Sequence, residues 1–80
     1  MPKIPIIKTK SFIELLIKYG CSEISVRGSH HKIFNPRTNR TSVVAIHGGQ
    51  DLDKGSFSGI LRQLDIDIED FLEFIKKQLK

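Results

Sequence analysis

The sequence predicts one α+β domain in which helices cover one face of a three-stranded antiparallel sheet. Three observations predict it: apolar stripes with helical spacing near both ends, three short β-segments with short links between them, and a length of 80 residues, enough for one small domain. Consecutive strands with short connections pair as an antiparallel meander. Such a sheet needs one covered face, and its other face stays open to solvent or a ligand.

The first helix is expected to start at Ser11, after a basic and extended leader over residues 1–10. Ser11 and Glu14 have the spacing of a capping box, in which each side chain satisfies a free backbone N–H. The apolar stripe of this helix is Phe12, Leu15, Leu16 and Tyr19. Gly20 suits the left-handed position that ends a helix. The expected organisation is a leader over 1–10 and a single domain over 11–80.

Three short strands are expected next. Apolar and polar residues alternate over residues 24–27, and Gly28 and Ser29 then form a tight turn. The second strand is expected at 30–35 and the third at 41–46, with a turn-rich segment between them.

Two further helices are expected in the last third of the chain. Residues 51–54 lead into the first, whose apolar stripe is Phe57, Ile60, Leu61 and Leu64. Asp67 can cap the last helix, with Asp70 as a weaker box partner. The apolar face of that helix is Ile68, Phe71, Leu72, Ile75 and Leu79. The lysines at its carboxyl end, where the helix dipole favours cations, are Lys76, Lys77 and Lys80.

Charge is distributed unevenly along the chain, whose net charge is +4. Residues 1–40 carry eight basic and two acidic side chains, a balance of +6, whereas residues 41–80 carry five and seven, a balance of −2. The first half therefore suits a polyanion, and an acidic protein partner is the alternative that charge leaves open. The sequence contains no bilayer-length apolar run and no signal-peptide pattern, so we expect a cytoplasmic protein without membrane contact. The single cysteine, Cys21, is interpreted as a small apolar residue.

Two adjacent histidines, His30 and His31, stand in the stretch RGSHHKIF. Adjacent strand residues point to opposite faces, so the pair is not expected to share a metal ion. No acidic residue is expected in register beside them, and we predict no metal site. Ser29 and His30 are neighbours in sequence, which seldom gives the geometry of a nucleophilic Ser-His pair, and no Gly-x-Ser-x-Gly elbow is present. An acyl-transfer enzyme is therefore not expected.

Cleavage of RNA needs fewer catalytic groups from the protein, because the 2′-OH of RNA is itself the nucleophile. It needs a proton acceptor or donor near neutral pH, which histidine supplies, and cations that hold the phosphate. Arg27 and Lys32 flank the histidines and can bind phosphate, and Gly28 lets a backbone come close. The alternative is that a histidine here only fills a position at the edge of the sheet.

His47 follows the third expected strand, at an end that an antiparallel meander places beside the start of the second strand. It is a candidate second acid or base, or a phosphate donor; capping the following loop is the alternative. Lys54, Gly55 and Ser56 open the next helix after a glycine-containing loop, and such a helix start can hold phosphate through free backbone amides. A plain helix start with flexible links is the other interpretation.

Taken in order, these motifs resemble the HicA toxins of HicA–HicB toxin–antitoxin pairs. The matching features are the turn Gly28-Ser29-His30, the hairpin after it, a strand ending in His47, and the segment KGSFSGILRQLDIDIEDFL from Lys54 to Leu72. The resemblance covers about Ser11 to Ile75, and the helical segment 66–80 is an addition to the family pattern.

The resemblance implies a fold like a double-stranded-RNA-binding domain, and a type II toxin that cleaves mRNA independently of the ribosome. It implies neutralisation by a HicB-type antitoxin and a single catalytic histidine, His30; it assigns no role to His31. We expect no metal and no cofactor. The expected RNA-binding residues are Arg27, Gly28, Ser29, Lys32, His47, Lys54 and Ser56. The alternatives are a non-catalytic RNA-binding module with the same fold and a small interaction protein whose basic face docks an acidic partner.

Overall fold

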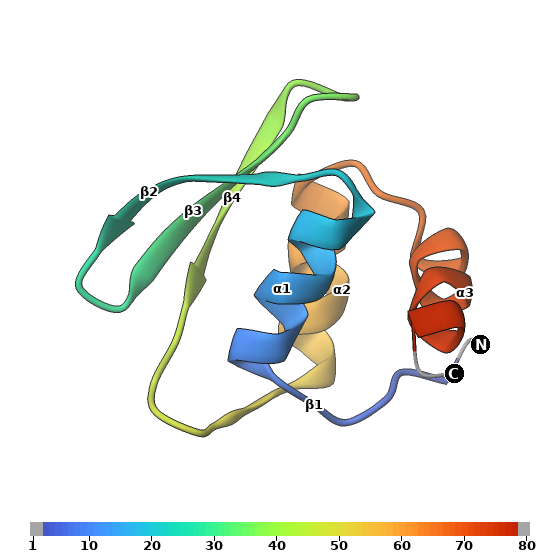
Figure 1. Ribbon diagram of the computed structural model, residues 1–80. Helices are drawn as coiled ribbons and strands as arrows, with labels where there is room; N and C mark the ends of the chain where they lie inside the picture. Colours follow the sequence, from blue (N-terminus) through green and yellow to red (C-terminus); the bar gives the residue numbers. More distant parts are fainter. Residues whose placement is uncertain (1–2, 79–80) are drawn as a thin grey trace.

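The element order is a helix, three strands and two helices, with one short strand added before each of the first two helices. The computed structural model describes residues 3–78. Its elements are β1 (Ile7–Lys8), α1 (Thr9–Tyr19), β2 (Ser22–Arg27), β3 (His30–Asn35), β4 (Arg40–Ala45), β5 (Asp51–Leu52), α2 (Lys54–Gln63) and α3 (Ile68–Gln78). β2, β3 and β4 form an antiparallel sheet in that order, and the predicted α+β class is confirmed (Figure 1). The predicted contributions of Leu79 and Lys80 to the last helix, and residues 1–2 of the leader, lie outside the described residues.

Side-chain alternation gives the sheet two different faces. α1 and α2 pack on one face, which we call the covered face (Figure 1). Its residues on β3 and β4 are His31, Ile33, Asn35, Ser42 and Val44, all of them buried except the half-buried His31. The opposite face, which we call the open face, carries His30, Lys32, Phe34, Thr41, Val43 and Ala45 from the same strands. The prediction that helices cover one face only is confirmed.

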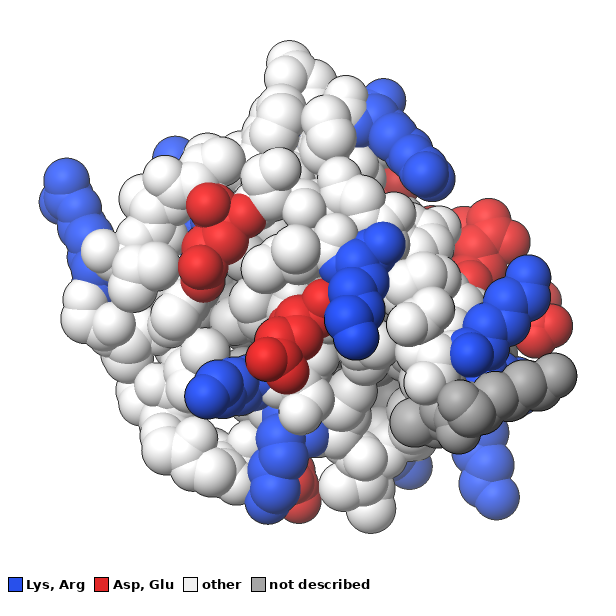
Figure 2. Space-filling model, viewed as in Figure 1, with Lys and Arg blue, Asp and Glu red and all other residues white. Residues whose placement is uncertain are grey.

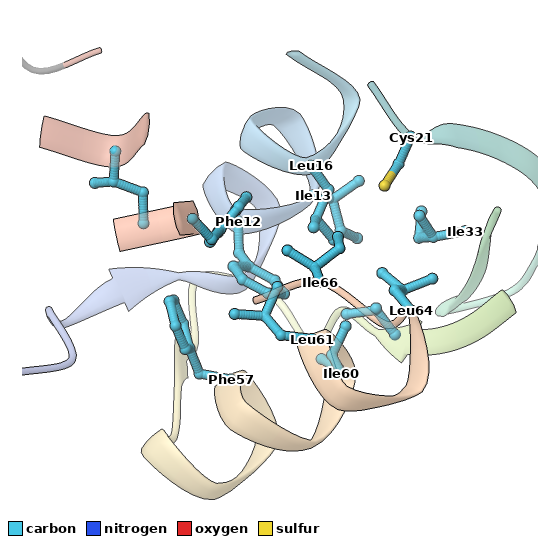
Figure 3. Packing of buried hydrophobic residues seen from close by; sticks show 13 residues of the cluster. Phe12, Ile13, Leu16, Cys21, Ile33, Phe57, Ile60, Leu61, Leu64 and Ile66 are labelled. Atoms are coloured by element: carbon cyan, nitrogen blue, oxygen red, sulfur yellow. The ribbon is translucent and has the colours of Figure 1, made fainter. Parts of the chain in front are cut away.

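The hydrophobic core lies between the covered face and the helices and continues to α3. Phe12, Phe57 and Phe71 are fully buried and come from α1, α2 and α3 respectively. The rings of Phe12 and Phe71 meet edge to face, with centroids 5.7 Å apart, a favourable arrangement for aromatic pairs. Figure 3 shows Phe57 with Leu61 and their neighbours in this cluster. The predicted apolar stripes therefore form the core.

The start of α1 differs from the sequence prediction. The helix begins at Thr9, two residues before Ser11, and its N-cap, Lys8, makes no side-chain capping hydrogen bond. β1 pairs with β5, with Lys8 opposite Asp51, and this pairing holds Lys8 extended. The backbone N–H and the hydroxyl of Thr9 both donate to the carbonyl of Gln50, at 3.2 Å each. The predicted capping box is therefore wrong, because long-range contacts satisfy the helix start.

The remaining helix ends follow local chemistry. Gly20 closes α1 with a φ of 128°, in the region that favours glycine, as predicted. Asp67 caps α3 as predicted, since its Oδ2 accepts the backbone N–H of Asp70 at 3.1 Å. Asp53 caps α2 in the same way. Within residues 3–78, no helix is long and apolar enough to cross a membrane.

The β3–β4 hairpin is fixed to the end of α2. The side-chain amide of buried Asn35 donates to the carbonyl of Leu64 at 2.8 Å, and the hydroxyl of Thr38 donates to the same carbonyl at 2.8 Å. These bonds satisfy a carbonyl at the helix terminus that has no partner inside the helix. β4, which corresponds to the strand predicted over residues 41–46, is shifted by one residue and runs from Arg40 to Ala45.

Candidate active site

The turn between β2 and β3 places His30 on the open face at one end of the sheet. Arg27 and His30 lie opposite each other across the two-residue turn. Gly28 takes a φ of 58°, which glycine adopts without steric cost. On its other side, His30 lies opposite Ala45 of β4, and its side chain is exposed. The first residue of the central strand is therefore accessible to a large ligand.

Two cations share the open face with His30. Lys32 lies two residues further along β3, and Arg27 lies directly across from His30 on β2. Both side chains are exposed, and neither forms an ion pair with any residue in the range 3–78. Figure 2 shows that basic side chains are spread over the visible surface with acidic ones among them. The open face near His30 can therefore offer positive charge without first breaking a salt bridge.

His31 lies on the covered face and has an acidic partner. Its Nδ1 lies 2.5 Å from the Oε1 of Glu23. The expectation that no acidic residue sits beside the histidines is therefore wrong. The reason is a register shift between Glu23 and Ser25, which places Glu23 opposite Ile33 and so on the same face as His31. The prediction that the two histidines point to opposite faces is confirmed.

His47 leaves the sheet at the end where His30 enters it. The backbone N–H of Ile46 donates to the carbonyl of Ser29 at 2.8 Å, which ties the end of β4 to the turn before His30. This is the proximity that the meander predicted. His47 is exposed and lines an open cavity of about 450 Å³ between β4 and α2, and Ser56 lines the same cavity. His47 and Ser56 thus line one hollow, and Ala45, which lies opposite His30, lines it as well.

The start of α2 already holds an anion, the carboxylate of Asp53. Its Oδ2 accepts the backbone N–H of Ser56 at 2.9 Å, and its Oδ1 accepts the Ser56 hydroxyl at 2.6 Å. These hydrogen bonds, the hydroxyl first, hold the pKa of Asp53 below its ordinary value. A phosphate would have to displace the carboxylate to reach that N–H. The exposed Lys54 side chain is the group at this helix start that remains available to one.

Other reactive side chains lie apart from the turn. Residues 3–78 contain no group of three or more His, Cys, Asp and Glu placed to hold a metal ion. Cys21 is buried, and burial raises the pKa of its thiol, which makes it a poor nucleophile. Its interpretation as a small apolar residue is confirmed.

The hollow between β4 and α2 was not predicted from the sequence. A second open cavity of about 590 Å³ continues it along β4, and Gln63 lines both. Most of the lining residues come from β4, from the segment 46–53 that contains β5, and from α2, which are separate in sequence. No local motif marks such a surface, because it exists only once α2 packs beside β4.

Comparison with known proteins identifies the family. The family model for the HicA toxin of bacterial toxin–antitoxin systems matches residues 9–66. That span contains α1, the three-stranded sheet, α2 and every predicted site residue, and it excludes β1 and α3. Searches of curated proteins and of solved structures found no match. The chain belongs to the HicA toxin family of bacterial toxin–antitoxin systems.

Proposed function

We propose that this HicA-family toxin is a ribosome-independent mRNA endonuclease in which His30 is the principal acid–base residue. The observation that supports the proposal most is the placement of an exposed His30 at the end of the central strand, with Arg27 directly across from it. Histidine titrates near neutral pH and can accept or donate a proton at the scissile phosphodiester. Because the 2′-OH of RNA serves as nucleophile, the reaction needs neither a metal ion nor a cofactor.

The second proton carrier in this proposal is His47. The hydrogen bond between Ile46 and Ser29 brings the chain segment of His47 to the turn that carries His30. One histidine then takes the proton of the 2′-OH while the other protonates the leaving 5′-oxygen. This division of labour is typical of general acid–base catalysis at a phosphodiester.

Binding of the RNA backbone is assigned to the cations around the turn. Arg27, Lys32 and Lys54 are exposed and hold phosphates electrostatically. Gly28 and Ser29 allow the backbone to approach, and the Ser56 hydroxyl is a further candidate contact. Affinity that depends on phosphate contacts falls as salt concentration rises.

A HicB-type antitoxin is the proposed protein partner, since toxins of this family belong to toxin–antitoxin pairs. Both proteins would act in the cytoplasm. The open face is the surface that a neutralising partner must keep from RNA, because it carries His30.

The test compares His30→Ala with His31→Ala in an RNA cleavage assay. The two residues are neighbours in sequence but lie on different faces, so His31→Ala is a matched control. We expect His30→Ala to fold and to lose cleavage by at least about a hundredfold, and His31→Ala to keep it. Full cleavage by a folded His30→Ala protein would refute the proposal. Salt-sensitive RNA binding without cleavage by the wild type would support the non-catalytic RNA-binding module instead.

A further inference from the structure

The two edges of the sheet, β2 and β4, are protected to different degrees. β2 contains a register shift between Glu23 and Ser25 and carries charged Glu23 and Arg27. Bulges and charges of this kind discourage a foreign strand from pairing with an edge. β4 pairs with β3 without irregularity, and its residues 41–45 contain neither a charge nor a proline. Of the two edges, β4 is the one suited to accept another strand.

The phase of the β3–β4 ladder shows which backbone groups are available on that edge. The N–H of Ile46 donates to the carbonyl of Ser29, and hydrogen-bonded pairs alternate with non-bonded ones in an antiparallel ladder. Thr41, Val43 and Ala45 are therefore the β4 residues whose N–H and C=O groups point away from β3. Val43, in the middle, has a side chain that is 54% exposed.

The hollow described above runs beside these groups. Its two cavities, of about 450 and 590 Å³, share Val43 and Gln63 among their lining residues. Gly59 of α2 lines the first, and a Cβ at that position would meet no atom within 4 Å. The side of α2 next to β4 thus leaves room for an extended chain along the strand.

We propose that the free edge of β4 is the docking site for an extended acidic segment of the protein partner, which adds a fourth strand to the sheet. The proposal rests on the antitoxin named as partner above. Main-chain hydrogen bonds from an added strand would satisfy Thr41, Val43 and Ala45, as in other cases of strand addition. Val43 would become covered at the centre of the new strand pair.

The charges around the β4 edge favour an acidic segment as the chain that docks there. Arg40 begins the edge strand, and Lys32 lies opposite Val43 on the open face of the neighbouring strand. The acidic residues that line the hollow already have partners within the protein: Asp51 forms an ion pair with Lys8 at 3.0 Å, and Asp53 caps α2. A second copy would bring two chains of net charge +4 together, whereas an acidic segment complements this edge.

A matched pair of proline substitutions tests the edge. Val26 on β2 is 51% exposed, close to the 54% of Val43. Arg27 and His30, which flank the two-residue turn, form a hydrogen-bonded pair of the ladder. The next residue, Val26, belongs to a non-hydrogen-bonded pair, so its N–H also points away from β3. Proline at either position removes an outward N–H without costing a ladder bond to β3. Val43→Pro and Val26→Pro therefore remove the same kind of backbone donor from opposite edges of the sheet, although the two side chains lie on different faces.

The measurement is calorimetric titration of purified HicB-type antitoxin into the toxin, with His30→Ala as background to prevent toxicity. We expect Val43→Pro to weaken binding by about a hundredfold, since it removes hydrogen bonds and leaves partner groups unpaired. Val26→Pro should change the affinity by less than about threefold. Circular dichroism confirms that each variant is folded. Equal affinity of the two variants, or no binding by the background protein, would overturn the proposal.

Amide hydrogen exchange by NMR provides a readout that needs no edge variant. In the complex, the amides of Thr41, Val43 and Ala45 should become protected, and that of Val26 should not. Unprotected β4 amides in the complex would contradict strand addition even if Val43→Pro failed to fold. A dimer of the toxin alone that Val43→Pro dissociates would assign the edge to a second copy and overturn the proposal. Absence of RNA cleavage together with protected β4 amides would refute the nuclease and leave the docking edge standing.

Discussion

The covered and open faces of the sheet are formed by the same strands but carry different residues: buried core residues on one face and exposed candidate site residues on the other. On the covered face, Ile33 and Val44 are buried in the core. On the open face, His30 and Lys32 point to solvent beside Arg27. Since neighbours along a strand alternate between the faces, a step of one residue separates a core position from a candidate catalytic one. Substitutions can therefore change the stability of this sheet and the chemistry of its open face independently.

Ile33, which is fully buried on β3, tests the contribution of the covered face to stability most directly. We expect Ile33→Ala to lower the free energy of unfolding by about 3 kcal/mol, through lost burial and the cavity left behind. The same kind of truncation on the open face, Val43→Ala, should cost less than about 1 kcal/mol. Urea denaturation of both variants measures the two values. Similar losses at Ile33 and Val43 would mean that the faces do not differ in their contribution to stability.

A second test on the covered face concerns Asn35, whose side chain is buried and bonded to the Leu64 carbonyl. We expect Asn35→Ala to cost about 2 kcal/mol, because it removes the hydrogen bond to Leu64 and the one that Asn35 Oδ1 accepts from the backbone N–H of Arg37 at 3.1 Å. Thr38→Val removes the other hydrogen bond to that carbonyl at a part-buried position, and should cost less. Thermal unfolding followed by circular dichroism checks the order. A larger loss for Thr38→Val would contradict the role given to Asn35.

The open face is tested by Lys32→Ala. Here we expect stability to change by less than about 0.5 kcal/mol. RNA binding should weaken, and the slope of log affinity against log salt should become shallower by about one. Lys77→Ala, on α3, is the control with the same change of charge, and it should leave the slope unaltered. The idea fails if the two variants have the same RNA affinity at every salt concentration.

The smallest effect is expected at Asp53, which lies beside the candidate site but acts as a helix cap. Its pKa in the folded protein is below the ordinary 3.8, so its charged form stabilises the fold. That stabilisation is fully present above 3.8 and is lost as the pH falls through the lower folded pKa. Asp53→Asn should therefore melt slightly below the wild type at neutral pH and converge with it in strong acid. A difference in melting temperature that persists at the lowest pH would show that the carboxylate charge is not the cause.

Local pattern predicted much of this molecule. The apolar stripes located the core, since Phe12, Phe57 and Phe71 all came from them and are fully buried. Strand alternation alone separated His30 from His31. These features depend on residues within a few positions of one another, which is the range over which helical and strand periodicity act.

The predictions that failed involve contacts or strand registers that the residues next to each position do not determine. Thr9 starts α1 because Gln50, 41 residues away, accepts its hydroxyl hydrogen bond. Glu23 reaches His31 only because the register of β2 shifts by one residue. The hollow beside β4 likewise forms only when α2 is packed next to that strand. No local pattern in the sequence encodes such arrangements. Only the structure therefore revealed the start of α1, the acidic partner of His31 and the hollow beside β4.

Phe71 also determines when the fold can close during synthesis. It comes from α3, beyond the family span of 9–66, yet its ring packs against Phe12 and against Phe57, with centroids 6.0 Å apart in the second pair. A ribosome releases the sheet and both of those partners before it releases Phe71. Until then, the emerging chain holds the turn of His30, but Phe12 and Phe57 lack one of their aromatic partners. A chain interrupted before Phe71 therefore has an incomplete core, which is open to proteases and chaperones.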